Sequence, residues 1–275
     1  MRGQIKERNY TVDFIVFGSG SKIVFAFHGF NNNAGNFSFL EPALGSDYKV
    51  IAINLFFHGD SHAEEELVEK GLSEEELKTF FELLCERFPA EKYILIGYSL
   101  GGRISLFLSG QFPEKVGHLI LIAPDGIRIS PFYKLVTQNK PGRKFLKGVV
   151  ENPAIFFGIG KFLRSFRLIN EKRYLFALNN FDSKEKREKV YRVWLIYRNV
   201  HVNIDVVRNT IMRHGIRTDM LFGAYDQIIP ASIGFKFQMG MEKQIGVHIL
   251  NSGHRLLNEN TGIEIANLLI REKSR

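Results

Sequence analysis

Short apolar runs alternate with helix-period segments over the first half of the chain. Runs rich in β-branched and aromatic residues predict strands, and they fall at residues 11–17, 22–27, 49–55, 92–97 and 118–123. Most of these runs are apolar at nearly every position, as expected of strands that are covered on both faces of a sheet. Strands separated by helices imply βαβ units. The pattern therefore predicts an α/β fold with a mostly parallel, doubly wound sheet.

The helices between these strands have recognisable starts. Ser73 is followed by three glutamates, which predicts an N-cap and an acidic first turn for a helix that runs to residue 88. A second helix is expected at residues 101–112, directly after a strand. Two further strands and a last helix are expected at residues 218–223, 246–250 and 263–275.

The middle third of the chain has a different pattern. Residues 127–217 contain helix-period segments and little convincing strand; Val190, Val193, Trp194 and Tyr197, for example, repeat at helical spacing. The simplest organisation is one α/β core, residues 1–124 and 218–275, interrupted by a helical cap or lid at residues 125–217.

Composition excludes several classes of protein. The 275 residues are 45% apolar and 24% charged, the mix of an ordinary globular protein rather than a disordered or fibrous one. No run approaches 18 apolar residues, and the charged start MRGQIKERNYTV has no apolar core typical of a secretory signal. The single cysteine, Cys85, cannot form an internal disulfide. We therefore expect a cytoplasmic protein.

Positive charge is concentrated in the predicted cap. Residues 127–217 hold 20 Lys and Arg against 6 Asp and Glu, whereas the rest of the chain holds 17 against 23. Such a balance can indicate an anionic partner, either an anionic membrane surface or an acidic acyl compound. The favoured interpretation is a lid that packs on the core with its charges in water. Aromatic residues are not enriched there, so no nucleic acid is expected as a partner.

The segment Gly97-Tyr98-Ser99-Leu100-Gly101 matches the G-x-S-x-G pattern of serine nucleophiles. A strand leads into Ser99 and a helix follows it, which is the setting that this pattern requires. Glycines permit the sharp turn that exposes the hydroxyl. The sequence therefore predicts Ser99 as a nucleophile.

A serine hydroxyl needs a base, and the base needs a carboxylate. His254 follows the last strand, where a loop leaves the carboxyl end of the sheet, and the order Ser, acid, His along the chain selects it. Asp226 follows the strand at 218–223 and is the favoured acid. Asp125, which follows the strand at 118–123, is the rival.

Two backbone amides are expected to bind the oxyanion. We predict the N–H of Leu100, at the start of the helix after Ser99, and the N–H of Phe30, in the loop after an early strand. His28 and Tyr98, next to these residues, are predicted to contact substrate.

Together these residues resemble the α/β-hydrolase superfamily. His28-Gly29-Phe30 is similar to its HG-x oxyanion motif, residues 97–102 to its nucleophile elbow, and residues 55–61 to its D-x-x-G-x-G-x-S loop. Asn54 and Leu55 stand where that loop often begins with Asp. The resemblance implies a cap inserted after the sixth strand. A serine at the elbow, rather than Asp, argues against the haloalkane dehalogenase and epoxide hydrolase branches.

The predicted activity is hydrolysis of an ester or thioester, small or lipid-like, through an acyl-enzyme on Ser99. No cofactor is expected, and no metal, since no Cys/His ligand spacing indicates one. Two alternatives stay open: a cofactor-free carbon–carbon hydrolase or lyase with the same triad, and a catalytically idle module that binds a small ligand. The sequence leaves the acyl length, the leaving group and the oligomeric state open.

Overall fold

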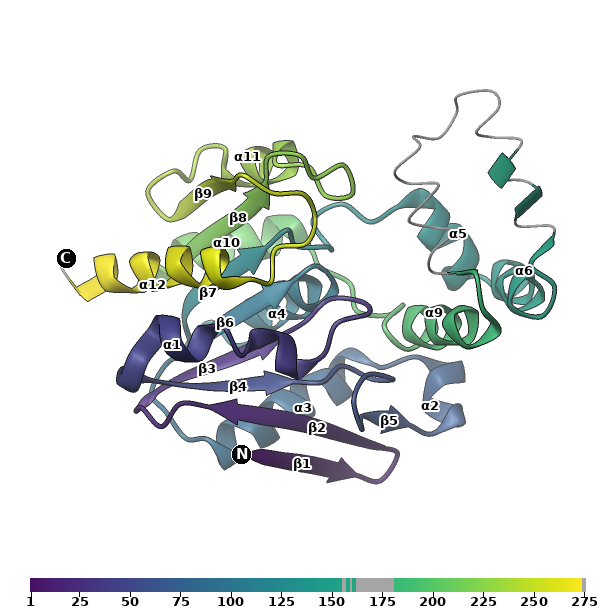
Figure 1. Ribbon diagram of the computed structural model, residues 1–275, viewed down its shortest axis with the longest axis horizontal. Helices are drawn as coiled ribbons and strands as arrows, with labels where there is room; N and C mark the ends of the chain where they lie inside the picture. The colour runs from purple at the N-terminus through teal and green to yellow at the C-terminus, as the bar shows by residue number, and fades with distance from the viewer. Residues whose placement is uncertain (155–156, 159, 162–180, 274–275) are drawn as a thin grey trace. The chain divides into compact units, whose positions relative to one another are not determined.

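A mostly parallel sheet forms the centre of the protein (Figure 1). The computed structural model describes residues 1–154, 157–158, 160–161 and 181–273. Eight strands follow the order β1-β2-β4-β3-β6-β7-β8-β9, and β5 pairs with β2. The pairs β1/β2 and β2/β4 are antiparallel, whereas the pairs from β4 through β9 are parallel. The strands are β1 (Arg2–Glu7), β2 (Tyr10–Phe17), β3 (Lys22–Phe27), β4 (Tyr48–Ile53), β5 (His62–Ala63), β6 (Tyr93–Tyr98), β7 (Val116–Ile122), β8 (Arg217–Gly223) and β9 (Ile245–Leu250).

The α/β fold class predicted from the sequence is confirmed, and each of the seven predicted strands is present within two residues of its expected ends. The sequence pattern missed β1 and the two-residue β5. β1 is an edge strand in which only Ile5 is buried, and its remaining positions are mostly charged or polar. Charges on an edge strand are a common protection against pairing with other chains, and they remove the apolar signal.

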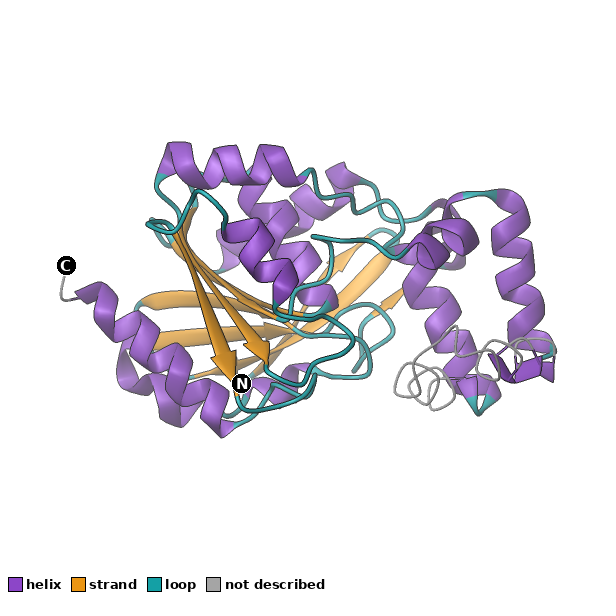
Figure 2. Cartoon of the chain, turned by 90° about the horizontal axis from the view of Figure 1, so that it is seen from above, coloured by secondary structure: helices purple, strands orange, loops and turns teal. Residues whose placement is uncertain are grey.

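Helices cover both faces of the sheet (Figures 1 and 2). On one face α1 (Leu40–Leu44) packs against α12 (Glu259–Lys273). On the other lie α3 (Glu74–Arg87), α4 (Leu100–Gln111) and α10 (Ile204–His214). A short helix, α11 (Ser232–Gln238), packs against β9. The capping box predicted for α3 is present: the Ser73 hydroxyl accepts from the Glu76 N–H, and the Glu76 carboxylate accepts from the Ser73 N–H.

The core lies between these helices and the central strands. Residues 24–27 of β3 and 119–122 of β7 are completely buried. Phe25 of β3 stacks on Tyr93 of β6, with ring centroids 5.1 Å apart, and contacts Phe81 of α3 edge-on. Burial on both faces accounts for the unbroken apolar runs in the sequence.

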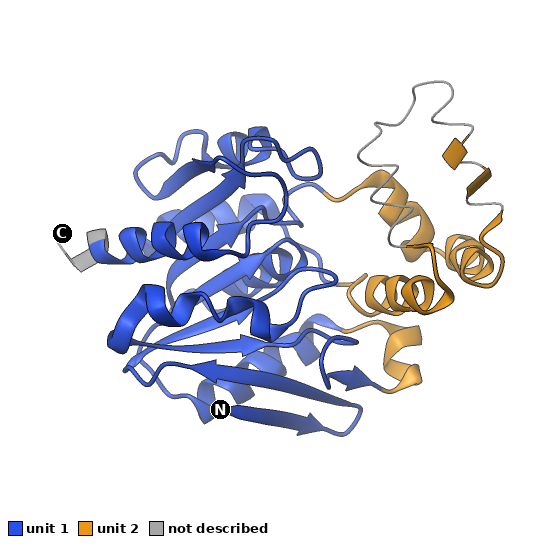
Figure 3. Ribbon diagram, in the orientation of Figure 1, with its two compact units in different colours: residues 1–63, 73–128, 200–275 blue, residues 64–72, 129–199 orange. Residues whose placement is uncertain are grey.

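The chain divides into two compact units, shown separately coloured in Figure 3. The sheet unit consists of residues 1–63, 73–128 and 200–275. The helical unit consists of residues 64–72 and 129–199. Its helices are α2 (Glu65–Lys70), α5 (Pro131–Gln138), α6 (Lys140–Glu151) and α9 (Lys184–Ile196), and no strand occurs in its described residues.

The helical unit differs in extent from the cap of residues 125–217 expected from the sequence. α10 belongs to the sheet unit because it packs against α4. Residues 64–72 belong to the helical unit because the buried Arg198 guanidinium donates to the carbonyls of Val68 and Glu69, and the Leu72 N–H donates to the Ile196 carbonyl. Without β5, β7 is the sixth strand along the chain, so residues 129–199 follow the sixth strand. A cap function for this insertion stays a prediction.

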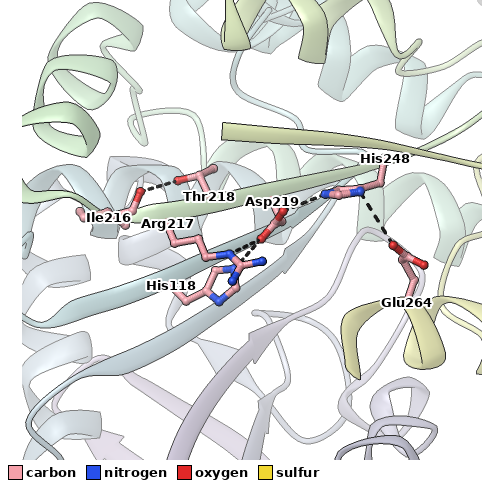
Figure 4. Close-up of polar contacts among 7 residues, drawn as sticks. All are labelled: His118, Ile216, Arg217, Thr218, Asp219, His248 and Glu264. Atoms are coloured by element: carbon pink, nitrogen blue, oxygen red, sulfur yellow. Dashed lines mark hydrogen bonds and ion pairs between the residues drawn. The ribbon is translucent and has the colours of Figure 1, made fainter. Parts of the chain in front are cut away.

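A buried carboxylate links the three neighbouring strands β7, β8 and β9 (Figure 4). Asp219 of β8 accepts from His118 Nε2 of β7 at 2.8 Å, from His248 Nε2 of β9 at 2.8 Å and from Arg217 Nε at 3.0 Å. Burial alone would raise the Asp219 pKa, but these donors outweigh it and hold the pKa well below its usual range. Glu264 of α12 lies 3.8 Å from His248 Nδ1. Folding therefore stabilises the charged form of the Asp219 carboxylate.

Replacing Asp219 should destabilise the fold in a pH-dependent way. Because the pKa is lowered in the folded state, the stabilisation is present above the unfolded value of about 3.9 and is lost as pH falls below it. At pH 7 we expect Asp219→Asn to lower the free energy of unfolding by about 3–5 kcal/mol, because the buried His118 and the partly exposed His248 and Arg217 lose their charged partner. Below pH 4 the difference from the wild type should shrink. Chemical denaturation at several pH values measures it, with Glu91→Gln, an exposed carboxylate outside the cluster, as the control; equal losses at pH 3 and pH 7 would contradict this reasoning.

Candidate active site

Ser99 occupies a strained turn between β6 and α4. Its φ is +50° and its ψ is −113°, a conformation that costs a non-glycine residue about 1–3 kcal/mol. The backbone around it fixes this geometry: the Ser99 N–H donates to the Ile122 carbonyl at 3.0 Å, and the Ser99 carbonyl accepts from the amides of Gly102 and Asp125 at 2.9 Å. The side chain is half-buried.

Glycine is required at two positions of this turn. A Cβ on Gly97 would lie 2.5 Å from Ser105 Oγ, and a Cβ on Gly101 would lie 1.9 Å from the Phe27 carbonyl oxygen. Both distances are far inside van der Waals contact, so a larger residue would push β6 away from α4 at position 97 and the turn away from β3 at position 101. The G-x-S-x-G spacing thus reflects close backbone packing.

The structure brings His254 and Asp226 together. Asp226 Oδ2 lies 2.7 Å from His254 Nδ1, and Asp226 Oδ1 accepts from the amides of Ile228 and Ile229 at 2.8 and 3.0 Å. The carboxylate side chain is completely buried. A carboxylate can only accept in this contact, so Nδ1 carries the proton and Nε2 is left as the basic nitrogen.

Tyr98 joins the His254 loop to the Ser99 turn. Its hydroxyl donates to the His254 carbonyl at 2.7 Å, and its ring lies 5.5 Å from the imidazole, centroid to centroid. Burial and the nearby Asp226 carboxylate raise the Tyr98 pKa well above its usual range, so the hydroxyl stays protonated. The sequence predicts a substrate contact for Tyr98, whereas this bond gives its hydroxyl a positioning role.

The described contacts of Ser99 and His254 include no hydrogen bond between Ser99 Oγ and the imidazole. Their shared neighbour Tyr98 precedes Ser99 in the chain and holds the His254 backbone. Catalytic hydrogen bonds are often long or poorly aligned without substrate and tighten in the complex.

Asp125, the rival acid, has a different partner. Its Oδ2 forms an ion pair with the buried Arg103 guanidinium, and its Oδ1 accepts from the Gly126 N–H at 2.7 Å. Its backbone N–H donates to the Ser99 carbonyl. Asp125 therefore contacts Arg103 and the backbone of the Ser99 turn, whereas Asp226 contacts His254.

The loop after β3 passes directly against the Ser99 turn. A Cβ on Gly29 would lie 3.0 Å from Ser99 Cβ, and the His28 carbonyl accepts from the Gly101 N–H at 3.0 Å. Leu100 is the first residue of α4, where the helix offers its N–H no internal acceptor. Phe30 directly follows Gly29, which lies against Ser99, and Leu100 directly precedes Gly101, which is bonded to His28. The backbone N–H groups of Phe30 and Leu100 therefore both lie next to a contact between the loop and the turn.

His28 itself is completely buried and bonded to the backbone. Its Nδ1 lies 2.7 Å from the Gly29 carbonyl oxygen, and its Nε2 accepts from the Leu55 N–H at 3.0 Å. Both ring nitrogens therefore hold the loop. The substrate contact predicted for His28 stays a prediction.

A polar network that the sequence analysis missed supports the loop of residues 54–61. Asp13 of β2 accepts from Asn54 Nδ2 at 2.7 Å, from the Asp60 N–H at 2.8 Å and from Ser61 Oγ at 2.9 Å. Asn54 Oδ1 in turn accepts from the Ala34 N–H at 2.7 Å. All three side chains are buried. Asn54 in place of the family's Asp was the available signal, since a second carboxylate there would face Asp13.

Other titratable groups lie outside this site. His118 and His248 bind Asp219 within the sheet, and His214 pairs with the exposed Glu114. Within the described ranges, no group of three His, Cys, Asp or Glu side chains is arranged to hold a metal ion. Nor does any helix in the described part of the chain have the length and apolarity needed to span a membrane.

Residues 22–260 match the family model described as "alpha/beta hydrolase fold". The chain belongs to this α/β-hydrolase family. The match includes the Ser99 turn, Asp226, His254 and the loop after β3.

Two relatives align with this α/β hydrolase over different shares of its length. It is 34% identical over 114 residues to the dihydrolipoyllysine-residue acetyltransferase component of an acetoin cleaving system from Pseudomonas putida, covering 42% of this chain and only 30% of that protein. It is 20% identical over 242 residues to the uncharacterized hydrolase YugF of Bacillus subtilis (strain 168), covering 87% and 86%. The chain thus spans less than a third of the first relative and most of the second.

Solved structures confirm the fold. An esterase from Thermogutta terrifontis aligns with a TM-score of 0.68 at 19% identity, covering 100% of this hydrolase and 98% of that chain. The thioesterase domain from a curacin biosynthetic pathway aligns with a TM-score of 0.64 at 13% identity, covering 98% and 99%. The epoxide hydrolase CorEH aligns with a TM-score of 0.65 at 14% identity, covering 99% of this hydrolase and 99% of that chain. At these identities the likeness establishes the fold alone.

Exchanging Asp13 and Asn54, the two partners at the base of the 54–61 loop, should show that the stability contributed by one depends on the other. We expect Asn54→Asp alone to destabilise the protein by about 2–4 kcal/mol, because two buried carboxylates would then face each other. Asp13→Asn combined with Asn54→Asp should recover most of the loss, since an amide at position 13 can donate to the new carboxylate and still accept from Asp60 and Ser61. Denaturant unfolding of the single and double variants measures the coupling. Strictly additive losses would contradict the pairing.

Proposed function

We propose that this α/β hydrolase cleaves esters or thioesters with Ser99 as nucleophile, His254 as base and Asp226 as the acid that orients it. The hydrogen bond between Asp226 and His254 Nδ1 is the observation that carries the proposal, because it leaves Nε2 as the basic nitrogen on a loop held beside the Ser99 turn. The strained backbone at Ser99 supports a functional role, since such strain persists where the surrounding structure enforces it.

The reaction proceeds through an acyl-enzyme. His254 Nε2 takes the Ser99 Oγ proton as Oγ bonds to the carbonyl carbon, and the amides of Phe30 and Leu100 stabilise the resulting oxyanion. His254 then protonates the leaving oxygen or sulfur as its bond to carbon breaks. Water completes the cycle: His254 takes its proton, the hydroxide adds to the acyl carbon, and Ser99 leaves with that proton.

The substrate is proposed to be a small or lipid-like acyl compound. The named esterase and thioesterase with this fold support that class. A carbon–carbon hydrolase is the second candidate, because a 2-hydroxy-6-oxononadienedioate/2-hydroxy-6-oxononatrienedioate hydrolase of Pseudomonas putida is 26% identical over 142 residues, half of this chain. A panel of p-nitrophenyl esters, acyl thioesters and vinylogous keto acids, measured side by side, separates the two reactions.

Removing the nucleophile should abolish catalysis. We expect Ser99→Ala to lower kcat/KM for p-nitrophenyl esters by at least about 10³-fold and to prevent labelling by a fluorophosphonate probe, because both need an activated hydroxyl. Ser232→Ala, an exposed serine on α11, is the matched control and should retain activity and labelling. Robust turnover by Ser99→Ala would exclude the mechanism. If neither the wild type nor Ser232→Ala reacts with any acyl substrate or probe, the catalytically idle binding module becomes the better interpretation.

The same assay distinguishes Asp226 from Asp125 as the acid that orients His254. Asp226→Asn should lose kcat by about 10²–10⁴-fold with its fold intact, because the imidazole loses the partner that fixes its tautomer. Asp125→Asn should act mainly through stability, since it breaks the ion pair with buried Arg103. A larger kcat loss in folded Asp125→Asn would assign the acid to Asp125.

We further propose that the helical unit contacts anionic membranes through residues 129–150, which hold α5 and all of α6 except its last residue, Glu151. This segment contains no Asp or Glu. Its five cations are Lys134, Lys140, Arg143, Lys144 and Lys147. Phe132, Leu135 and Phe145 are 45%, 62% and 41% exposed. Cations beside exposed apolar side chains are the combination that binds anionic lipid surfaces, at about 1 kcal/mol per cation near the surface.

Vesicle co-sedimentation tests this contact. The protein should bind vesicles of anionic phosphatidylglycerol, should not bind neutral phosphatidylcholine vesicles, and should dissociate at high salt as screening weakens the attraction. Lys140, Lys144 and Lys147 changed together to Gln should lose most binding. The matched control changes three exposed cations of the sheet unit, Arg213, Lys236 and Lys243, to Gln and should bind as the wild type does. Equal binding by both triple variants, or no binding to either vesicle, removes the membrane contact.

A further inference from the structure

We propose that His58 is a positioning residue for the oxyanion site, holding the backbone that follows Phe30 in the orientation that catalysis requires. This inference rests on the proposed function. His58 is 2% exposed and lies on the 54–61 loop, across from the loop after β3. Its Nε2 accepts from the Asn31 N–H at 3.1 Å, and its ring meets the Phe30 ring edge-on at 5.8 Å.

The hydrogen bonds of His58 define one tautomer. Its Nδ1 lies 3.0 Å from the Phe56 carbonyl oxygen, which can only accept, so Nδ1 carries the proton. Nε2 faces a backbone donor, so it presents a lone pair. His58 therefore joins the two loops as a neutral ring that donates on one side and accepts on the other.

Fixed peptide planes flank the Phe30 amide on both sides. Before it, the His28 carbonyl is bonded to the Gly101 N–H of the Ser99 turn. After it, the Asn31 N–H is bonded to His58. The Gly29 carbonyl, which shares a peptide group with the Phe30 N–H, is held by His28 Nδ1 at 2.7 Å and by the Asn32 N–H at 3.2 Å. Because a trans peptide is planar, holding that carbonyl fixes the opposite direction for the Phe30 N–H.

Without His58, the backbone of Asn31 would lose the hydrogen bond that holds its conformation. Its φ is +60°, in the left-handed region, which a residue with a side chain adopts at a cost. Phe57, immediately before His58, also has a left-handed φ of +64°. The bond between the two loops thus connects two strained turns. Loss of the acceptor on His58 would let Asn31 relax and turn the neighbouring Phe30 amide away from the developing oxyanion.

The 54–61 loop is rigid enough to act as the anchor. Asp13 binds Asn54, the Asp60 N–H and Ser61 Oγ, and His28 Nε2 accepts from the Leu55 N–H. The rings of His28 and His58 lie 4.9 Å apart, centroid to centroid. The loop is therefore tied at both ends to strands of the sheet, and His58 projects from a fixed support.

The experiment compares His58→Leu with His58→Gln in the full chain. Leu fills a similar volume without an acceptor, whereas the Gln side-chain oxygen can reach the place of Nε2. We expect Leu to lower kcat for a p-nitrophenyl ester by about 10–100-fold with KM within twofold, less than the 10²–10³-fold of deleting an oxyanion donor. Gln should restore at least half of that loss on a logarithmic scale. The rate of fluorophosphonate labelling should fall in parallel with kcat.

His62→Leu is the matched control, because His62 lies on an exposed position four residues along and its side chain is bonded to the Asp60 carbonyl rather than to the loop after β3. It should retain the wild-type kcat. Equal kcat in the His58→Leu and His62→Leu variants overturns the inference, as does a loss that appears in KM, or a folded Gln variant as slow as the Leu variant.

A spectroscopic measurement keeps the inference testable if the Leu variant does not fold. In the ¹⁵N NMR spectrum of the wild type, His58 should show a protonated Nδ1 and a non-protonated Nε2 at pH 7; the reverse tautomer overturns the inference. This signature does not depend on turnover. An inactive wild type with the expected tautomer would count against the proposed function, whereas an active wild type with an unaffected His58→Leu variant would count against the role of His58 alone.

Discussion

The candidate site depends on one close backbone contact, where the turn after β6 passes the end of β3. No side chain fits between Gly101 and the Phe27 carbonyl, and the Gly101 N–H is bonded to the next carbonyl, that of His28. Because β3 and β6 are neighbouring parallel strands, their carboxyl ends bring the Ser99 turn and the loop after β3 to the same edge. The proposed nucleophile and the backbone amides of the loop after β3 thus meet without a long-range side-chain contact.

Side chains from elsewhere in the sheet then hold this geometry. β8 supplies Asp226 from the loop after its last residue, and the loop after β9 supplies His254. The loop after β4 supplies His58, which is supported by Asp13 of the antiparallel strand β2. Hence one half of the sheet positions the proposed proton-transfer groups, His254 and Asp226, and the other half positions the amides proposed to bind the oxyanion. The two halves meet at β6, the strand that ends in Ser99.

The sequence was sufficient for the parts of the molecule that follow local rules. Unbroken apolar runs identified the buried strands, the Ser73 capping box identified the start of α3, and the glycines around Ser99 identified the sharp turn. Some contacts between residues that lie far apart in the chain could not be predicted from the sequence. Asp13 sits at a position that reads as part of an apolar strand, and its contact with Asn54 depends on the antiparallel pairing of β2 with β4. The extent of the helical unit was also hidden, since residues 64–72 join it through carbonyl contacts with Arg198 that leave no pattern in the sequence.

The position of the insertion has a consequence for biosynthesis. Residues 123–216 separate β7 from β8, its parallel neighbour. At about 5–20 residues per second, a ribosome takes roughly 5–20 s to make this stretch. Throughout that interval β7, whose last four residues are wholly apolar and buried in the finished sheet, presents an open hydrogen-bonding edge. The nascent chain therefore passes through a period in which this apolar edge awaits a partner that has not yet been translated.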